Sequence, residues 1–275
     1  MKIVFGLHQI DKTQLHSKFV YDMFYVSIQM ANELGYETVL YGTPDAIERL
    51  GKYVTEVHNT DGLDYIFFDD LKMHILETRN DNYLIMDGDV FLHSPLVFKN
   101  NNPFLYVDTI VKAQHSGYMK DALTTFNTFN IQSIIPEWNP FTKISFSTGL
   151  LKIKPNNGLL KYYIESYKKL RSWFLENENE LTKNSLELES KKSLSSHIIC
   201  EHLLQRMIEY YGLKFEQLDN ENSYYHWQGS EKFKNSDKVN CITLLSDTHK
   251  VMNGTIKNVY DYLVNTNQIK PILYP

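Results

Sequence analysis

The chain has 275 residues, of which 43% are hydrophobic and 22% are charged, and its formal net charge is −5. These values predict one large domain, or a domain with a small appendage, that has a substantial core. They argue against a nucleic-acid-binding protein, which would carry a basic surface. No apolar stretch approaches the roughly 20 residues of a membrane span, and the start of the chain is too short and too polar for a signal peptide. We therefore expect a cytoplasmic protein, with peripheral membrane contact left open.

The first part of the chain alternates between expected strands and helices. Apolar residues three or four apart predict helices over residues 18–34, 45–50 and 71–78. Short apolar or β-branched runs predict strands over residues 2–7, 37–42, 54–57, 65–68 and 83–86. This alternation predicts an α/β fold with a mostly parallel sheet and helices on its faces.

The second part of the chain is less regular. We expect a strand over residues 104–107, an irregular section over 113–140, a strand-like segment over 144–153 broken by Ser147-Thr148-Gly149, and a helix over 159–175. Residues 176–196 are polar and predict a solvated helix-loop insertion. A helix over residues 198–211 follows, then short strands near Lys214 and Cys241 and a helix over residues 256–264.

The most informative motif is Asp87-Gly88-Asp89, which directly follows the apolar run of residues 83–86. Carboxylates two residues apart in an extended segment point to the same side, and the glycine between them allows the backbone to turn. Ligands of such sheets bind outside the carboxyl ends of the strands. The pair therefore predicts a divalent-cation site, against the simpler alternative of a turn in which both aspartates accept backbone hydrogen bonds.

Four segments in order resemble the motifs of GT-A-fold glycosyltransferases, and above all of the glycogenin-like family 8 enzymes. They are residues 68–72, 83–91, 146–153 and 249–257. The resemblance implies a GT-A fold, a Rossmann-like nucleotide-binding mixed sheet flanked by helices. Residues 1–110 would form the nucleotide-sugar-binding half, and residues 111–275 the acceptor-side half. It also implies transfer of a sugar from a nucleotide-diphosphate sugar to a hydroxyl of a glycan, lipid or protein, with retention of anomeric configuration.

In that family the two aspartates and a late histidine hold Mn²⁺, and a following lysine binds the diphosphate. Carried over to this sequence, these roles fall on Asp87, Asp89, His249 and Lys257, with Lys250 as the rival phosphate ligand. The family spacing is usually HxxGxxK, and from His249 to Lys257 this chain is two residues longer. Mixed carboxylate and imidazole ligands suit Mn²⁺ better than Mg²⁺.

The resemblance also places residues around the donor. Gly6, His8 and Tyr41 would hold the nucleotide, and Lys72 would lie near the donor sugar. Ser147 and Gly149 stand where the family has an Asn-x-Gly loop beside the sugar. Glu201 would contact the donor sugar, and would be the general base if the enzyme were inverting. For Tyr41, Lys72 and Glu201, a purely structural role is a comparable alternative.

Two other functions remain open on the sequence. A nucleotidyltransferase of sugar phosphates uses a related sheet, although it normally has a glycine-rich basic loop that Gly6-Leu7-His8-Gln9 does not provide. A non-catalytic, metal-stabilised binding protein would lose its fold, rather than its turnover, on substitution of Asp89. The aromatic residues Trp138 and Tyr224 to Trp227 could stack on sugars or anchor the core.

Overall fold

A computed structural model describes residues 1–8, 18–63, 65, 67, 69–99, 104–112, 129–138, 144–155, 158–177, 198–218 and 223–226. Its mixed seven-stranded sheet has the strand order β3-β2-β1-β4-β7-β6-β8, which confirms the predicted α/β class. Contacts divide the chain into two compact units. The first comprises Met1–Asp61, Met86–Val97 and Asp219–Pro275, and the second comprises Gly62–Ile85 and Phe98–Leu218. The predicted halves were defined by function rather than by contacts, so the boundary at residue 110 stays a prediction.

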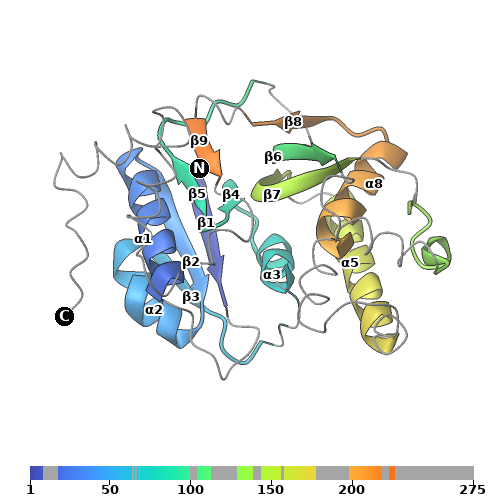
Figure 1. The fold of residues 1–275 in the computed structure, drawn as a ribbon, viewed down its shortest axis with the longest axis horizontal. Helices are drawn as coiled ribbons and strands as arrows, with labels where there is room; N and C mark the ends of the chain where they lie inside the picture. The colour runs from blue at the N-terminus through green and yellow to red at the C-terminus, as the bar shows by residue number, and fades with distance from the viewer. Residues whose placement is uncertain are drawn as a thin grey trace. The chain divides into compact units, whose positions relative to one another are not determined.

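In the described part of the first unit, helices pack on parallel strands (Figure 1). Strands β1 (Lys2–Leu7), β2 (Glu37–Gly42) and β3 (Glu56–Asn59) pair in parallel, so their carboxyl ends lie at the same edge. Helices α1 (Lys18–Glu33) and α2 (Pro44–Leu50) are followed by a 3₁₀ turn, η1 (Gly51–Tyr53). A separate antiparallel ribbon joins β5 (Val90–Leu92) to β9 (Tyr224–His226).

The described residues of the second unit include strands β4, β6, β7 and β8 and the helix α5. Antiparallel β6 (Leu105–Lys112) and β7 (Ile144–Ile153) are joined by β8 (Phe215–Gln217), which pairs in parallel with β6. Strand β4 (Tyr83–Met86) is fully buried. The helical elements are α3 (Asp70–Thr78), η2 (Ile131–Ser133), α5 (Gly158–Glu176), the π-helical turn η3 (Ile198–His202) and α8 (Leu203–Tyr210). Contacts of α5 with α3, η3 and α8 form the helical side of this unit.

Local sequence signals explain several element ends. Helix α2 begins where the Thr43 side chain accepts a hydrogen bond from the Ala46 amide, with Pro44 in the first turn, as expected for an N-cap followed by proline. Gly35 ends the first helical region in the left-handed conformation, with φ of 79°. These features confirm the predicted helices over residues 18–34 and 45–50.

Three sequence predictions differ from the structure. The described residues within 65–68, Tyr65 and Phe67, are not in a strand. Instead the Phe67 amide donates to Asp70 Oδ2 at 2.9 Å, which forms the turn before α3. Strand β7 is continuous through Ser147-Thr148-Gly149, because a bulge absorbs the irregular residues. The helix expected over residues 198–211 begins as a π-helical turn and continues as α-helix.

Other predicted features lie outside the described residues. These are the insertion beyond Asn177, the strand near Cys241 and the helix over residues 256–264. Within the described part of the chain, none of the helices is long and apolar enough to cross a membrane.

Candidate functional site

Asp87-Gly88-Asp89 forms a tight turn between β4 and β5. The Val90 amide donates to the Asp87 carbonyl at 3.1 Å, which closes the turn. Gly88 is required here, because a Cβ at this position would overlap the ring of Phe24 in α1. Ser27, one helical turn further along α1, donates to the Val90 carbonyl at 2.5 Å. The first unit therefore holds the turn rigidly, with Asp87 half-buried and Asp89 buried.

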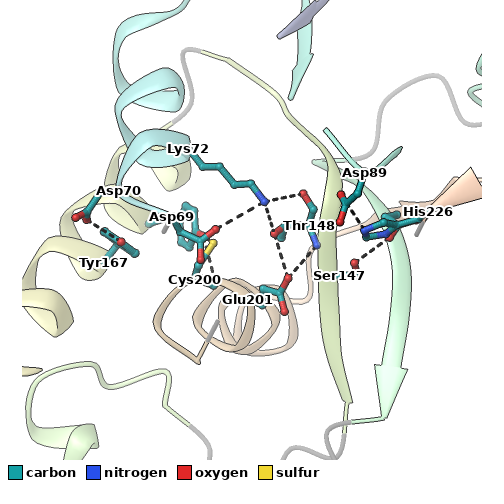
Figure 2. A network of polar contacts seen from close by, with 12 residues as sticks. Asp69, Asp70, Lys72, Asp89, Ser147, Thr148, Tyr167, Cys200, Glu201 and His226 are labelled. Atoms are coloured by element: carbon teal, nitrogen blue, oxygen red, sulfur yellow. Dashed lines mark hydrogen bonds and ion pairs between the residues drawn. The ribbon is translucent and has the colours of Figure 1, made fainter. Parts of the chain in front are cut away.

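The structure brings His226 to Asp89. Strand β9 pairs with β5 so that His226 lies opposite Val90, the residue after Asp89. The distance from His226 Nε2 to Asp89 Oδ1 is 3.5 Å, and each side chain is 11% exposed (Figure 2). An acidic turn and an imidazole are thus held together within the first unit by strand pairing.

The donor atoms at this position suit a divalent cation. Ligands about 2.1 Å from an ion lie roughly 3 Å apart when they occupy adjacent positions around it. The 3.5 Å between His226 Nε2 and Asp89 Oδ1 is close to that spacing. Within the described ranges no three His, Cys, Asp or Glu side chains form a ready-made metal-binding group. An ion here would therefore draw other ligands from elsewhere, as metals bound to nucleotides do from phosphate oxygens.

His226 was not among the expected metal ligands, although a sequence signal for it exists. His226, Gly229 and Lys232 have the HxxGxxK spacing that the family resemblance requires. The sequence prediction rests on His249, in a segment that is two residues longer than this spacing. His249, Lys250 and Lys257 lie outside the described residues, as does Lys232.

The residues expected to hold the nucleotide lie at the carboxyl ends of the parallel strands. Gly6 pairs with Tyr41, and Tyr41 pairs with His58, while buried His8 directly follows β1. Tyr41 is only 4% exposed, and its ring stacks on His58 with ring centroids 4.3 Å apart and planes 13° apart. His58 is the more exposed member of this stack, at 39% of its side chain. Its Nε2 is hydrogen-bonded to Glu56 Oε1 at 2.5 Å.

Lys72 lies in a buried polar network of the second unit (Figure 2). Its ammonium donates to the Thr148 carbonyl and to Thr148 Oγ1, both at 3.1 Å, and lies 3.7 Å from Asp69 Oδ1. Helix α3 is fixed at its first residue, because Asp70 Oδ1 accepts bonds from Tyr167 and Arg171 of α5, each at 2.9 Å. Lys72 is therefore a buried, paired cation.

Glu201 belongs to the same network. Its Oε1 accepts hydrogen bonds from the Thr148 amide and hydroxyl, both at 3.1 Å. It lies in the π-helical turn η3, a conformation that often marks functional positions. The preceding Cys200 is fully buried beside the Tyr163 hydroxyl, and burial raises the pKa of its thiol well above the usual range. Cys200 therefore stays a neutral thiol and is no candidate nucleophile.

Ser147 and Thr148, in the Ser147-Thr148-Gly149 segment, contact different partners. Ser147 was the expected sugar-side residue, yet its hydroxyl donates to Asp108 Oδ2 at 2.8 Å. Thr148, which was not predicted, makes the contacts with Lys72 and Glu201. Gly149 lies in the bulged part of β7. Because neighbouring strand residues point to opposite sides, the sequence alone did not identify which hydroxyl faces the network.

Comparisons with known proteins give similarity in structure only. No protein-family model and no curated protein match this sequence. A crystal structure of galactosyltransferase LgtC in complex with donor and acceptor sugar analogues has a TM-score of 0.40 and 11% identity, covering 79% of this chain and 73% of that chain. Glycosyltransferase GlyE of Streptococcus pneumoniae has a TM-score of 0.38 and 10% identity, over 80% of this chain and 46% of that chain. The PaToxG glycosyltransferase has a TM-score of 0.39 and 11% identity, over 77% and 70%.

Proposed function

We propose that this chain is a GT-A-type glycosyltransferase that uses a divalent cation, best Mn²⁺, to transfer a sugar from a nucleotide-diphosphate sugar to a hydroxyl acceptor. The observation that carries the proposal is the contact of His226 with Asp89. Asp89 is the second aspartate of the acidic turn, which follows the buried strand β4. Carboxylates and an imidazole form a mixed oxygen and nitrogen ligand set, which suits Mn²⁺ better than Mg²⁺.

Within this proposal His226 is the histidine ligand of the metal, a role that the sequence resemblance assigned to His249. Two independent features favour it: the 3.5 Å approach to Asp89, and the HxxGxxK spacing from His226 to Lys232. Lys232 accordingly replaces Lys257 and Lys250 as the preferred ligand of the diphosphate. A bound cation would neutralise the charge that develops on the leaving diphosphate.

The chain's own residues would bind and orient the donor. Asp87 and Asp89 hold their positions because Gly88 and Phe24 fix the turn. The carboxyl ends of β1 and β2, at Gly6, His8 and Tyr41, would receive the nucleotide. Lys72 and Glu201, oriented by Thr148, would contact the sugar. Retention of configuration, a protein, lipid or glycan acceptor, and a cytoplasmic location are parts of the proposal that rest on the family resemblance and the sequence.

The assignment of the metal ligand can be tested by Mn²⁺ binding. We compare His226→Ala with His249→Ala by electron paramagnetic resonance of free Mn²⁺, titrated in the presence of UDP or GDP. Loss of a direct ligand should weaken Mn²⁺ binding at least about 10-fold in His226→Ala, and leave it near wild type in His249→Ala. Circular dichroism checks that both variants are folded.

The opposite pattern would return the ligand role to His249 and contradict this assignment. If neither variant changes Mn²⁺ binding, the acidic turn acts without a histidine ligand, and the proposed site is wrong in that part. Wild-type protein that binds no Mn²⁺ with either nucleotide would contradict metal-dependent transfer as a whole.

A further inference from the structure

Strand β7 carries a bulge at the point where it meets the polar network. Val107 of β6 pairs with Leu151 and Thr109 pairs with Ser147, so the single residue Asp108 lies opposite three residues of β7. Thr148 is the first of those three. Bulges disrupt the regular ladder and re-aim the residues within them.

The main-chain groups of Thr148 are used by the network. Its amide donates to Glu201 Oε1, and its carbonyl accepts from the Lys72 ammonium, both at 3.1 Å. In a regular strand these groups would bond to a neighbouring strand. At the bulge, the main chain of Thr148 therefore contacts both Lys72 of α3 and Glu201 of η3.

The Thr148 hydroxyl has a defined direction. An ammonium can only donate, so Thr148 Oγ1 accepts from Lys72 at 3.1 Å. The hydroxyl is then oriented to donate to Glu201 Oε1, also at 3.1 Å. A hydroxyl that accepts from a cation and donates to a carboxylate links the two by charge-assisted hydrogen bonds. Thr148 is 1% exposed, so water competes little for these bonds.

We infer that Thr148 is a positioning residue that fixes Lys72 and Glu201 relative to each other for the transfer reaction. This inference rests on the proposed function, because it assigns the network to the sugar-side chemistry. Thr148 itself acts through these two side chains. A displacement of about 1 Å in groups that position the substrate can lower the rate about 100-fold.

The experiment uses the full chain and the isosteric variant Thr148→Val, which removes the hydroxyl link and keeps the main-chain contacts. We expect kcat for sugar transfer, or for slow donor hydrolysis, to fall between about 10- and 100-fold. Thr148→Ser restores the hydroxyl and should stay within about 3-fold of wild type. Thr38→Val is the matched control. Thr38 is a fully buried strand threonine of the first unit whose hydroxyl donates to Asn32 at 2.8 Å, and its loss should leave kcat unchanged.

A double-mutant cycle with Lys72→Met separates positioning from general stability. If the hydroxyl couples to Lys72, the effects of Thr148→Val and Lys72→Met will be less than additive, both in kcat and in the melting temperature measured without donor. If Thr148→Val does not fold, Thr148→Ala replaces it as the variant without the hydroxyl. Its kcat is then compared with that of Thr148→Ser, which keeps the hydroxyl.

The outcomes separate this inference from the proposed function. If the wild type turns over, either of two results would overturn the role of Thr148. One is a wild-type kcat in Thr148→Val, and the other is additive effects in the double-mutant cycle. Absence of transfer and of hydrolysis with every nucleotide sugar would overturn the proposed function, whereas the melting-temperature cycle would still report whether Thr148 couples to Lys72.

Discussion

At the scale of single residues, the acidic turn depends on the glycine between its two aspartates. Gly88 separates Asp87 from Asp89, and the Phe24 ring occupies the space where its side chain would be. Phe24 is buried in the first unit, so it has little room to move. The geometry of the two carboxylates therefore depends on packing against α1 as well as on the turn itself.

We predict that Gly88→Ala is destabilising because the new methyl group overlaps the Phe24 ring. Overpacking of this kind typically costs about 1–3 kcal/mol in the free energy of unfolding, which urea denaturation measures. Phe24→Leu in the same chain should recover part of that loss, because it removes the overlapping ring atoms. Equal destabilisation by Gly88→Ala with and without Phe24→Leu would show that backbone conformation, rather than the ring, requires the glycine.

The sequence predicted some site residues and missed others for physical reasons. Asp87 and Asp89 were predictable because an apolar strand and a turn signal are local. The contact of Asp89 with His226 depends on pairing between β5 and β9, strands that are more than 130 residues apart. Such long-range pairing leaves no local periodicity. Only the HxxGxxK spacing could have pointed to His226.

At the scale of elements, the same distinction holds. Helices α1, α2, α3 and α5 follow the predicted ranges closely, because the 3.6-residue apolar pattern is local. The bulge in β7 was predicted as a break, since Ser147-Thr148-Gly149 departs from the strand pattern. At this irregularity Thr148 contacts Lys72 of α3 and Glu201 of η3. These contacts depend on elements distant in the sequence, so they were not predictable.

Helix α8 contains a buried cation of a different kind. Arg206 is 1% exposed, and its guanidinium lies 4.5 Å from the centre of the Trp138 ring. Among the described residues, no hydrogen-bond acceptor contacts its three guanidinium nitrogens. Burial lowers the pKa of Arg206 to about 10, partly opposed by the charge of Glu209. The cation–π contact offsets only part of this cost of burial.

We predict that Arg206→Met raises the free energy of unfolding at pH 7 by about 1–3 kcal/mol, because it removes the desolvated charge and keeps most of the packing. The pH dependence gives a second check. Between the folded-state pKa of about 10 and the higher ordinary pKa of an arginine, the unfolded chain binds more protons at this residue than the folded chain does. The wild type should therefore gain stability relative to Arg206→Met as the pH rises from 9 towards 11. A destabilised variant with no such trend would show that the guanidinium stabilises the fold.

At the scale of the whole molecule, charge makes a cation necessary for the proposed donor. The chain has a net charge of −5, and two of its carboxylates, Asp87 and Asp89, lie where the proposed diphosphate would bind. Two carboxylates repel a diphosphate at short range, and one divalent cation would neutralise their charge and provide a ligand position for the phosphate oxygens. We therefore expect the protein to bind nucleotide sugars in the presence of the divalent cation and to bind them poorly in its absence.

The most direct measurement is a thermal-shift panel of nucleotide sugars with and without Mn²⁺, on the wild type and on Asp89→Asn. We predict that at least one nucleotide sugar raises the wild-type melting temperature only when Mn²⁺ is present. Asp89→Asn should keep a folded chain and lose that shift. Metal-independent shifts, or no shift with any nucleotide sugar, would contradict a metal-dependent glycosyltransferase. An unfolded Asp89→Asn would instead favour a cation that serves only the fold.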